Sequence, residues 1–171
     1  DFGDGYSSTE ENPYNTYVEA GSYNVTLTAF NDDGEHSITK PVTINEPTVL
    51  GFTVYEDDQE TVIPGAEVWL YDNEYDWQEY NEPQFVATTN NDGIVLFLNL
   101  ESQKYWVDVY KEVTGGYWYG YGGTEIIPQN EITSYWIALD FFTDETKKST
   151  DRGPRKDSTI VLKRKPDAHR R

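Results

Sequence analysis

The residue types that most often perform catalysis are few in this chain. The two histidines, His36 and His169, stand in an expected surface strand and in a basic C-terminal stretch. A Ser-His-Asp site needs an ordered serine nucleophile beside the histidine. Ser37 is only the sequence neighbour of His36, and no elbow-type motif surrounds it. We therefore predict no hydrolytic triad.

Other catalytic chemistries are equally unsupported. The chain has no cysteine, which excludes a thiol nucleophile, a zinc thiolate site and disulfides. Its 31 acidic residues make chance carboxylate pairs frequent, and no motif singles out a glycosidase-like pair. We predict that the chain is not an enzyme.

Calcium is the inorganic ligand that the sequence favours, because Ca²⁺ takes several oxygen ligands from flexible acidic loops. The candidate ligands are Asp1, Asp4, Asp32, Asp33, Asp57 and Asp58. None of these segments has the spacing of an EF-hand loop, and aspartate-rich turns also arise from backbone hydrogen bonding alone. Two interpretations stay open, a calcium site or turn chemistry only. No cofactor is required by the sequence.

Aromatic side chains form the second group of candidate site residues. Trp69 and Trp106 alternate with apolar residues, so they should lie on the outer face of a sheet whose other face is buried. Such rings either stack on sugars or are covered, and the glycine-flanked segment 115–123 is the expected cover or a recognition surface of its own. The candidate residues for binding a glycan or a protein partner are Trp69, Trp106, Tyr117, Trp118, Tyr119 and Tyr121.

The charge of the chain is strongly asymmetric. Residues 1–146 hold 28 acidic and 3 basic side chains, about −25, whereas residues 147–171 hold 3 acidic and 10 basic ones, about +7. An acidic body repels the nucleic-acid backbone, so we expect no nucleic-acid partner. No apolar run reaches about 18 residues, so we expect no membrane insertion. Residues 147–171 either end in a strand over 158–162 or dock on the acidic body.

Hydrophobic residues recur with a period of two between frequent glycines and prolines, which predicts an all-β chain. A hairpin is expected where Asn31-Asp32-Asp33-Gly34 separates two alternating stretches, followed by a boundary near residue 47. Asp76 to Asn81 has room for one helical turn. Further strands are expected around residues 50–54, 66–70, 85–88, 94–98, 105–110, 132–142 and 158–162. The fold class is tandem antiparallel β-sandwiches.

The first 45 residues resemble a PKD domain, an immunoglobulin-like module of bacterial surface and secreted proteins. The matching residues are Asp1-Phe2-Gly3-Asp4-Gly5, Asn12-Pro13, Tyr17, Gly21, Tyr23 to Leu27 and Asn31 to Gly34. Asn15 departs from the pattern, since this family often has histidine there. The strands that normally precede this signature are missing from the sequence, so residues 1–46 are expected to be the C-terminal portion of a PKD fold, with an exposed half-core.

Residues 47–165 resemble a transthyretin-like or carboxypeptidase-regulatory-like β-sandwich, similar also to B-type adhesin repeats. The matching motifs are Pro64-Gly65-Ala66-x-Val68-x-Leu70, Ala87-Thr88-Thr89 with Asp92-Gly93-x-Val95-x-Phe97, and Lys104-Tyr105-x-Val107. Some adhesin repeats contain an isopeptide bond from a first-strand lysine to a last-strand asparagine. Neither residue is present here, so we expect no such crosslink. Residues 166–171 form a basic tail.

These resemblances imply a non-catalytic bacterial module, extracellular or at the cell surface, that acts as a spacer or adhesion element in a longer protein. Its partners would be neighbouring domains of the same polypeptide and a polysaccharide or cell-surface protein. One alternative is a carbohydrate-binding accessory module of a secreted polysaccharide-degrading enzyme. Another is a fragment adjoining a peptidase domain, because both folds occur beside peptidases. Fold resemblance alone does not choose among them.

Overall fold

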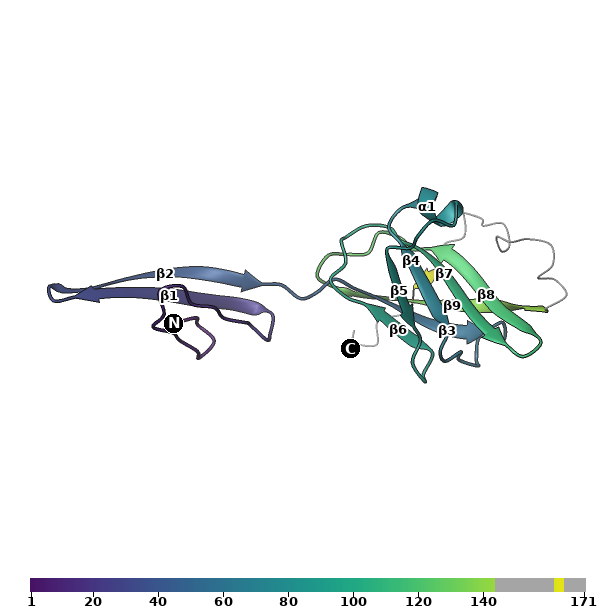
Figure 1. Ribbon diagram of the computed structural model, residues 1–171, viewed down its shortest axis with the longest axis horizontal. Coiled ribbons are helices and arrows are strands. Elements are labelled where there is room, and N and C mark those ends of the chain that lie inside the picture. Colours follow the sequence, from purple (N-terminus) through teal and green to yellow (C-terminus); the bar gives the residue numbers. More distant parts are fainter. Residues whose placement is uncertain (144–161, 165–171) are drawn as a thin grey trace. The chain divides into compact units, whose positions relative to one another are not determined.

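The computed structural model describes residues 1–143 and 162–164 and divides the chain into two compact units (Figure 1). Unit 1 is Asp1–Glu46 and unit 2 is Pro47–Arg171. Apart from one short helix, the regular elements of the described residues are β-strands. The all-β prediction is therefore confirmed.

Unit 1 is built on a long antiparallel hairpin of β1 (Gly21–Asn31) and β2 (Gly34–Ile44). The register pairs Leu27 with Ile38, which places the apolar side chains of both strands on one face. Gly34 has φ 145°, a conformation that favours glycine, and the turn stands where the sequence predicted it.

The segment before β1 is bonded to the hairpin. The Thr26 amide donates to the Asp1 carbonyl at 2.9 Å, so the start of the chain lies beside β1. The Tyr17 hydroxyl donates to the Phe2 carbonyl at 2.8 Å, and the Asn15 side-chain amide donates to Asp4 at 2.8 Å. The departure at Asn15 thus keeps a hydrogen-bond donor at that position.

Unit 2 contains the remaining strands and the helix α1 (Glu74–Gln78). The strands are β3 (Val49–Glu56), β4 (Glu67–Tyr71), β5 (Phe85–Thr88), β6 (Ile94–Phe97), β7 (Trp106–Val113), β8 (Gly116–Gly123), β9 (Ile132–Thr143) and β10 (Lys163–Arg164).

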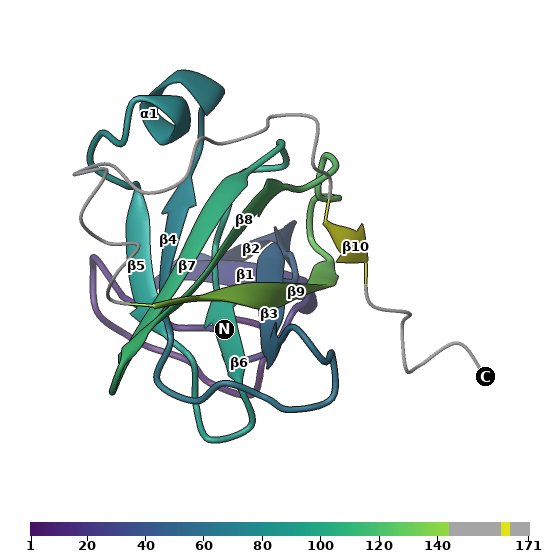
Figure 2. The ribbon, with the colours of Figure 1, turned by 90° about the vertical axis from the view of Figure 1, so that its right-hand side faces the viewer.

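The strands of unit 2 form two layers that share β9. Their order is β5-β4-β7-β8-β9-β3-β6, and β10 also pairs with β9 (Figure 2). The beginning of β9 pairs with β3, and its last residues pair with β8. The β3–β9 pair is parallel, whereas the sequence suggested antiparallel pairing throughout. Alternation of side chains reports which face is buried but not the direction of a neighbouring strand.

The core of unit 2 lies between the two layers and follows the predicted alternation. Its fully buried side chains are Leu50, Phe52, Val54, Ala66, Val68, Leu70, Val107, Val109, Tyr135 and Leu139. Each strand contributes every second residue, because successive side chains point to opposite faces. The alternation expected around Trp69 in β4 and Trp106 in β7 is confirmed.

Three local expectations have different outcomes. The segment expected as a cover, 115–123, is mostly a sheet strand, β8. The helical turn begins at Glu74, before the expected Asp76. The expected strand over 158–162 lies outside the described residues except for Leu162, which precedes β10, and the tail 166–171 also lies outside them.

Candidate functional site

An aromatic cluster covers the outer face of β4 and β7. Tyr71, Trp77 and Trp106 are buried together, and half-buried Trp69 and Tyr121 pack against them. Trp77 comes from α1, and its side chain is fully buried. The sequence predicted outward rings on these strands but missed Trp77 as their cover. A single buried tryptophan on a five-residue helix leaves no periodicity that would have revealed it.

Local hydrogen bonds fix the short helix in place. The Asn73 side chain accepts from the Asp76 amide at 2.8 Å, as an N-cap residue does. The Asn81 side-chain amide donates to the Asp76 carboxylate at 2.6 Å, and Asn73 also donates to it. These donors hold the pKa of Asp76 below its usual value. The helix is therefore held at both ends while Trp77 enters the cluster.

Asp108 is the polar centre beneath these rings and is 1% exposed. Its Oδ1 accepts from the Trp77 Nε1–H and from the Tyr119 hydroxyl, each at 3.0 Å. Burial and the nearby carboxylate raise the pKa values of Tyr71 and Tyr119. Buried charge is tolerated only when it is well hydrogen-bonded, so this arrangement ties α1 and β8 to β7.

The structure does not gather the six predicted recognition residues on one open surface. Trp106 and Tyr119 are buried, and Trp69 is half-buried in the cluster. Trp118 lies on the opposite, core-facing side of β8, with its ring 5.1 Å from that of Phe141. Tyr121 lies 5.9 Å from the Trp77 ring. Tyr117 also lies on the outer face of β8 and is half-buried, but it does not belong to the cluster around Trp77.

A row of rings that the sequence analysis missed adjoins Tyr117. Its ring lies 5.5 Å from that of Tyr110 and stacks at 5.3 Å on Phe142, with 14° between the planes. The row crosses β7, β8 and β9. Its last member could not be placed without the register of β9 against β8, which pairs Tyr117 with Phe142.

Phe142 also borders a groove between β8 and β9. The two strands pair only from Gly116 to Tyr119 and then diverge. The groove has a volume of about 390 Å³ and is lined by Tyr119, Gly120, Tyr121, Trp136, Ile137, Ala138, Asp140, Phe142, Leu162 and Lys163. The Lys163 ammonium lies 5.2 Å from the Trp136 ring. Aromatic walls with an exposed carboxylate at Asp140 give this groove the character of a ligand site.

Several of the predicted calcium ligands accept hydrogen bonds from nearby backbone amides. Asp1 and Asp4 each accept a nearby backbone amide, at 2.7 and 3.0 Å. Asp58 accepts the Glu60 and Thr61 amides and the Thr61 hydroxyl, which hold its pKa below the usual value. Across residues 1–143 and 162–164, no three His, Cys, Asp or Glu side chains converge as a metal-binding group. The calcium site stays a prediction.

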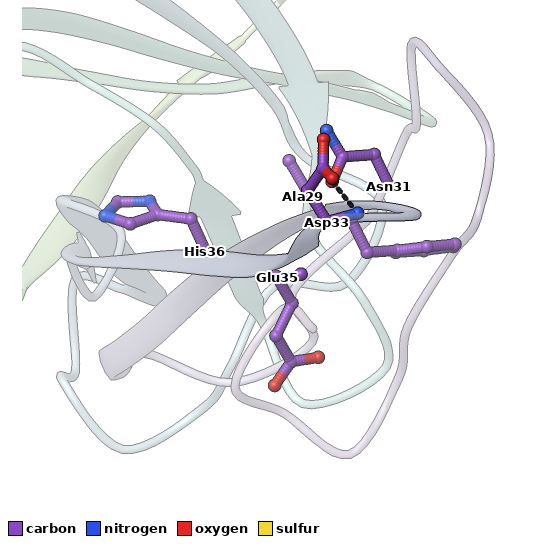
Figure 3. Close-up of a pocket in the computed structure, with 7 residues that line it drawn as sticks. Ala29, Asn31, Asp33, Glu35 and His36 are labelled. Carbon is purple, nitrogen blue, oxygen red and sulfur yellow. Dashed lines mark hydrogen bonds between the residues drawn. The ribbon is translucent and has the colours of Figure 1, made fainter.

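The remaining pair, Asp32 and Asp33, lies at the hairpin turn of unit 1. Figure 3 shows a shallow hollow there, in which the Asp33 amide donates to the Asn31 side chain at 3.0 Å. His36 points away from Asn31 and Asp33. The contact is that of an Asx turn formed by the Asn31 side chain, and Asp33 contributes only its backbone amide. His169 lies outside the described residues.

Two comparisons with known proteins give matches. The family described as PKD domain matches residues 1–45. Among solved structures, the group B streptococcus pilus 2b backbone protein is 13% identical at TM-score 0.47, over 80% of this chain and 55% of that one. The major pilin subunit BcpA of Bacillus cereus is 14% identical at TM-score 0.44, over 72% of this chain and 40% of that one.

An enzyme is also among the structural matches. Phospholipase PlaB from Legionella pneumophila is 17% identical at TM-score 0.40, over 79% of this chain and 33% of that one. No sequence of a curated protein matches the chain significantly. The chain thus spans one third to just over half of these solved structures. At such identities and scores, the matches add nothing to the sandwich class that the strand order defines.

No helix within the described residues combines the length and the hydropathy needed to cross a lipid bilayer.

Proposed function

We propose that the chain is a non-catalytic module of a bacterial surface or secreted protein, where it serves adhesion or spacing beside other domains of the same polypeptide. The supporting observation is that Asp108, the buried acid of unit 2, has a structural role. This buried acid is bonded to Trp77 and Tyr119 and is covered by rings, so it holds the fold together. The acidic surface discourages association of edge strands between copies.

Localisation tests this proposal directly. An antibody raised against residues 47–143 should label intact cells of the source organism or detect the protein in the culture medium. Detection only after cell lysis would contradict the proposal. The purified chain should also hydrolyse no ester, peptide or glycoside substrate, and turnover that is lost in Asp108→Asn would show instead that this acid is catalytic.

A second candidate function is polysaccharide binding, which the groove between β8 and β9 favours. Phe142 forms part of its wall and is backed by Tyr117, so the ring is held before any ligand arrives. Preformed aromatic walls with a few polar groups are typical of small-ligand sites. The acidic charge of the chain favours a neutral glycan over an anionic one.

Affinity electrophoresis in gels with neutral polysaccharides tests this second candidate. The chain should be retarded by its ligand, and Phe142→Ala should remove most of the retardation. Tyr75→Ala is the matched control, because Tyr75 is 70% exposed on α1, outside the residues that line the groove. Equal retardation of both variants, or none for the unchanged chain, would reject glycan binding in the groove.

A further inference from the structure

We infer that unit 2 is mounted at the end or side of its parent protein and presents its far end, rather than lying in line as a spacer. The inference rests on the proposed surface function and selects between its two forms. It follows from the directions of the three strands β3, β9 and β10.

The chain joins and leaves the described part of unit 2 at the same end of β9. The first pair of β3 is Val49 with Ile132, and β3 runs parallel to β9. The last pair of β10 is Arg164 with Tyr135, and β10 runs antiparallel to β9. We call this the near end. The far end is where Glu56, at the end of β3, pairs with Leu139.

The separation of the two connections follows from strand geometry. Ile132 and Tyr135 are three residues apart, about 10 Å along a strand, and β3 and β10 each lie about 5 Å to the side of β9. Val49 and Arg164 are therefore about 14 Å apart. The eight residues of β3 span about 26 Å, so an in-line unit would have to separate its connections by at least that length.

Contacts outside its own pairing hold β10 in this position. The Leu162 amide donates to the Gly123 carbonyl at 2.8 Å, and the Leu162 side chain packs against the core. The Lys163 ammonium lies over the Trp136 ring. Backbone, apolar and cation–π contacts thus all hold β10 in the orientation that its pairing with β9 defines.

This arrangement has a mechanical consequence. Tension applied at residues 46 and 165 acts first on β10, which two residue pairs join to β9. Once these pairs separate, the tension passes along the chain to Thr143. Tension between residues 46 and 143 instead acts along the parallel β3–β9 pair, where eight residue pairs share the load. Unit 2 therefore lies in line with the tension only after β10 has been released. It is well placed to present the turns 57–62 and 90–93 at its far end.

Single-molecule force measurements on the full chain test the inference. The chain has no cysteine, so handles attach only at introduced sites. The pair Glu46→Cys and Lys165→Cys should show a first release of chain at a force severalfold lower than the unfolding force of the control pair Glu46→Cys and Thr143→Cys, which should lack this step. Absence of the early step, or a first step at an equal or higher force, would overturn the inference.

Fluorescence transfer in solution gives a second measurement without force. Dyes at Glu46→Cys and Lys165→Cys should transfer energy more efficiently than dyes at Glu46→Cys and Gln59→Cys, because Gln59 is in the far-end turn. The reverse order would overturn the inference. Glu46, Thr143 and Gln59 are exposed, and unchanged thermal unfolding would confirm that each variant folds. Neither result depends on cellular localisation, so this inference and the proposed function fail separately.

Discussion

Trp77 donates its indole N–H to the carboxylate of Asp108 at 3.0 Å, although the two residues are 31 positions apart. Both side chains are almost completely buried. The bond joins the helix α1 to the outer face of β7, and the Tyr119 hydroxyl from β8 reaches the same oxygen. One carboxylate therefore holds three elements together in a layer that is otherwise aromatic.

Removal of this carboxylate should be strongly destabilising. Asp108→Ala leaves the buried donors of Trp77 and Tyr119 without their acceptor, so we expect a loss of about 3 kcal/mol in the free energy of unfolding. Urea denaturation followed by tryptophan fluorescence measures this loss. The exposed acid Asp140 provides the control, because Asp140→Ala should change stability by less than about 0.5 kcal/mol. Similar losses for the two variants would mean that Asp108 has no special structural role.

Alkaline pH should weaken unit 2 through its buried tyrosines. Burial raises the pKa of Tyr119, so the folded state keeps a proton that the unfolded state releases above about pH 10. Stability is therefore fully present below that pH and falls above it, by up to about 1.4 kcal/mol per pH unit for this group. Denaturation between pH 9 and 11 should show this slope, and Tyr119→Phe should reduce it. Tyr75→Phe, at an exposed position, should leave the slope unchanged; a reduction equal to that of Tyr119→Phe would refute the assignment.

The sequence predicted those features that depend on local alternation. The alternation around Trp69 predicts the buried face of β4, and Asn31 to Gly34 predicts a turn, because burial on one face and turn chemistry leave a pattern within a few residues. The bond of Trp77 to Asp108 and the parallel β3–β9 pairing depend on residues distant in sequence, so no local pattern contains them.

β8 was missed for a different reason. Its apolar residues do not alternate with polar ones, since both faces of the strand are covered: Trp118 packs toward the core while Tyr119 and Tyr121 face the outer cluster. Glycines occupy the positions at which the backbone of β8 lies closest to its neighbours. A Cβ at Gly120 would lie 2.7 Å from Leu139 Cδ2. Such a sequence reads as a flexible loop until its neighbours are known.

Gly116 provides a sharp test of the pairing between β8 and β9. A Cβ at this position would collide with the carbonyl of Phe142, a backbone group that cannot turn aside. We expect Gly116→Ala to cost about 2 kcal/mol or more in thermal or urea unfolding. Gly51→Ala is the matched control, because its nearest atom is the end of the exposed Leu96 side chain, and it should cost less than about 1 kcal/mol. If Gly51→Ala were the more damaging of the two, the β8–β9 register would be wrong.

The hairpin of unit 1 leads to a prediction about autonomous folding. Leu27 and Ile38 face each other across β1 and β2 but remain 68% and 51% exposed, so their apolar face buries little surface. A two-stranded hairpin is marginally stable in water without a further layer. A peptide of residues 1–46 should therefore show the narrow amide dispersion of an unfolded chain in a ¹H–¹⁵N spectrum, whereas residues 47–171 should show wide dispersion. Wide dispersion for the peptide would mean that the contacts of Asp1, Phe2 and Tyr17 suffice to fold unit 1 without additional sequence.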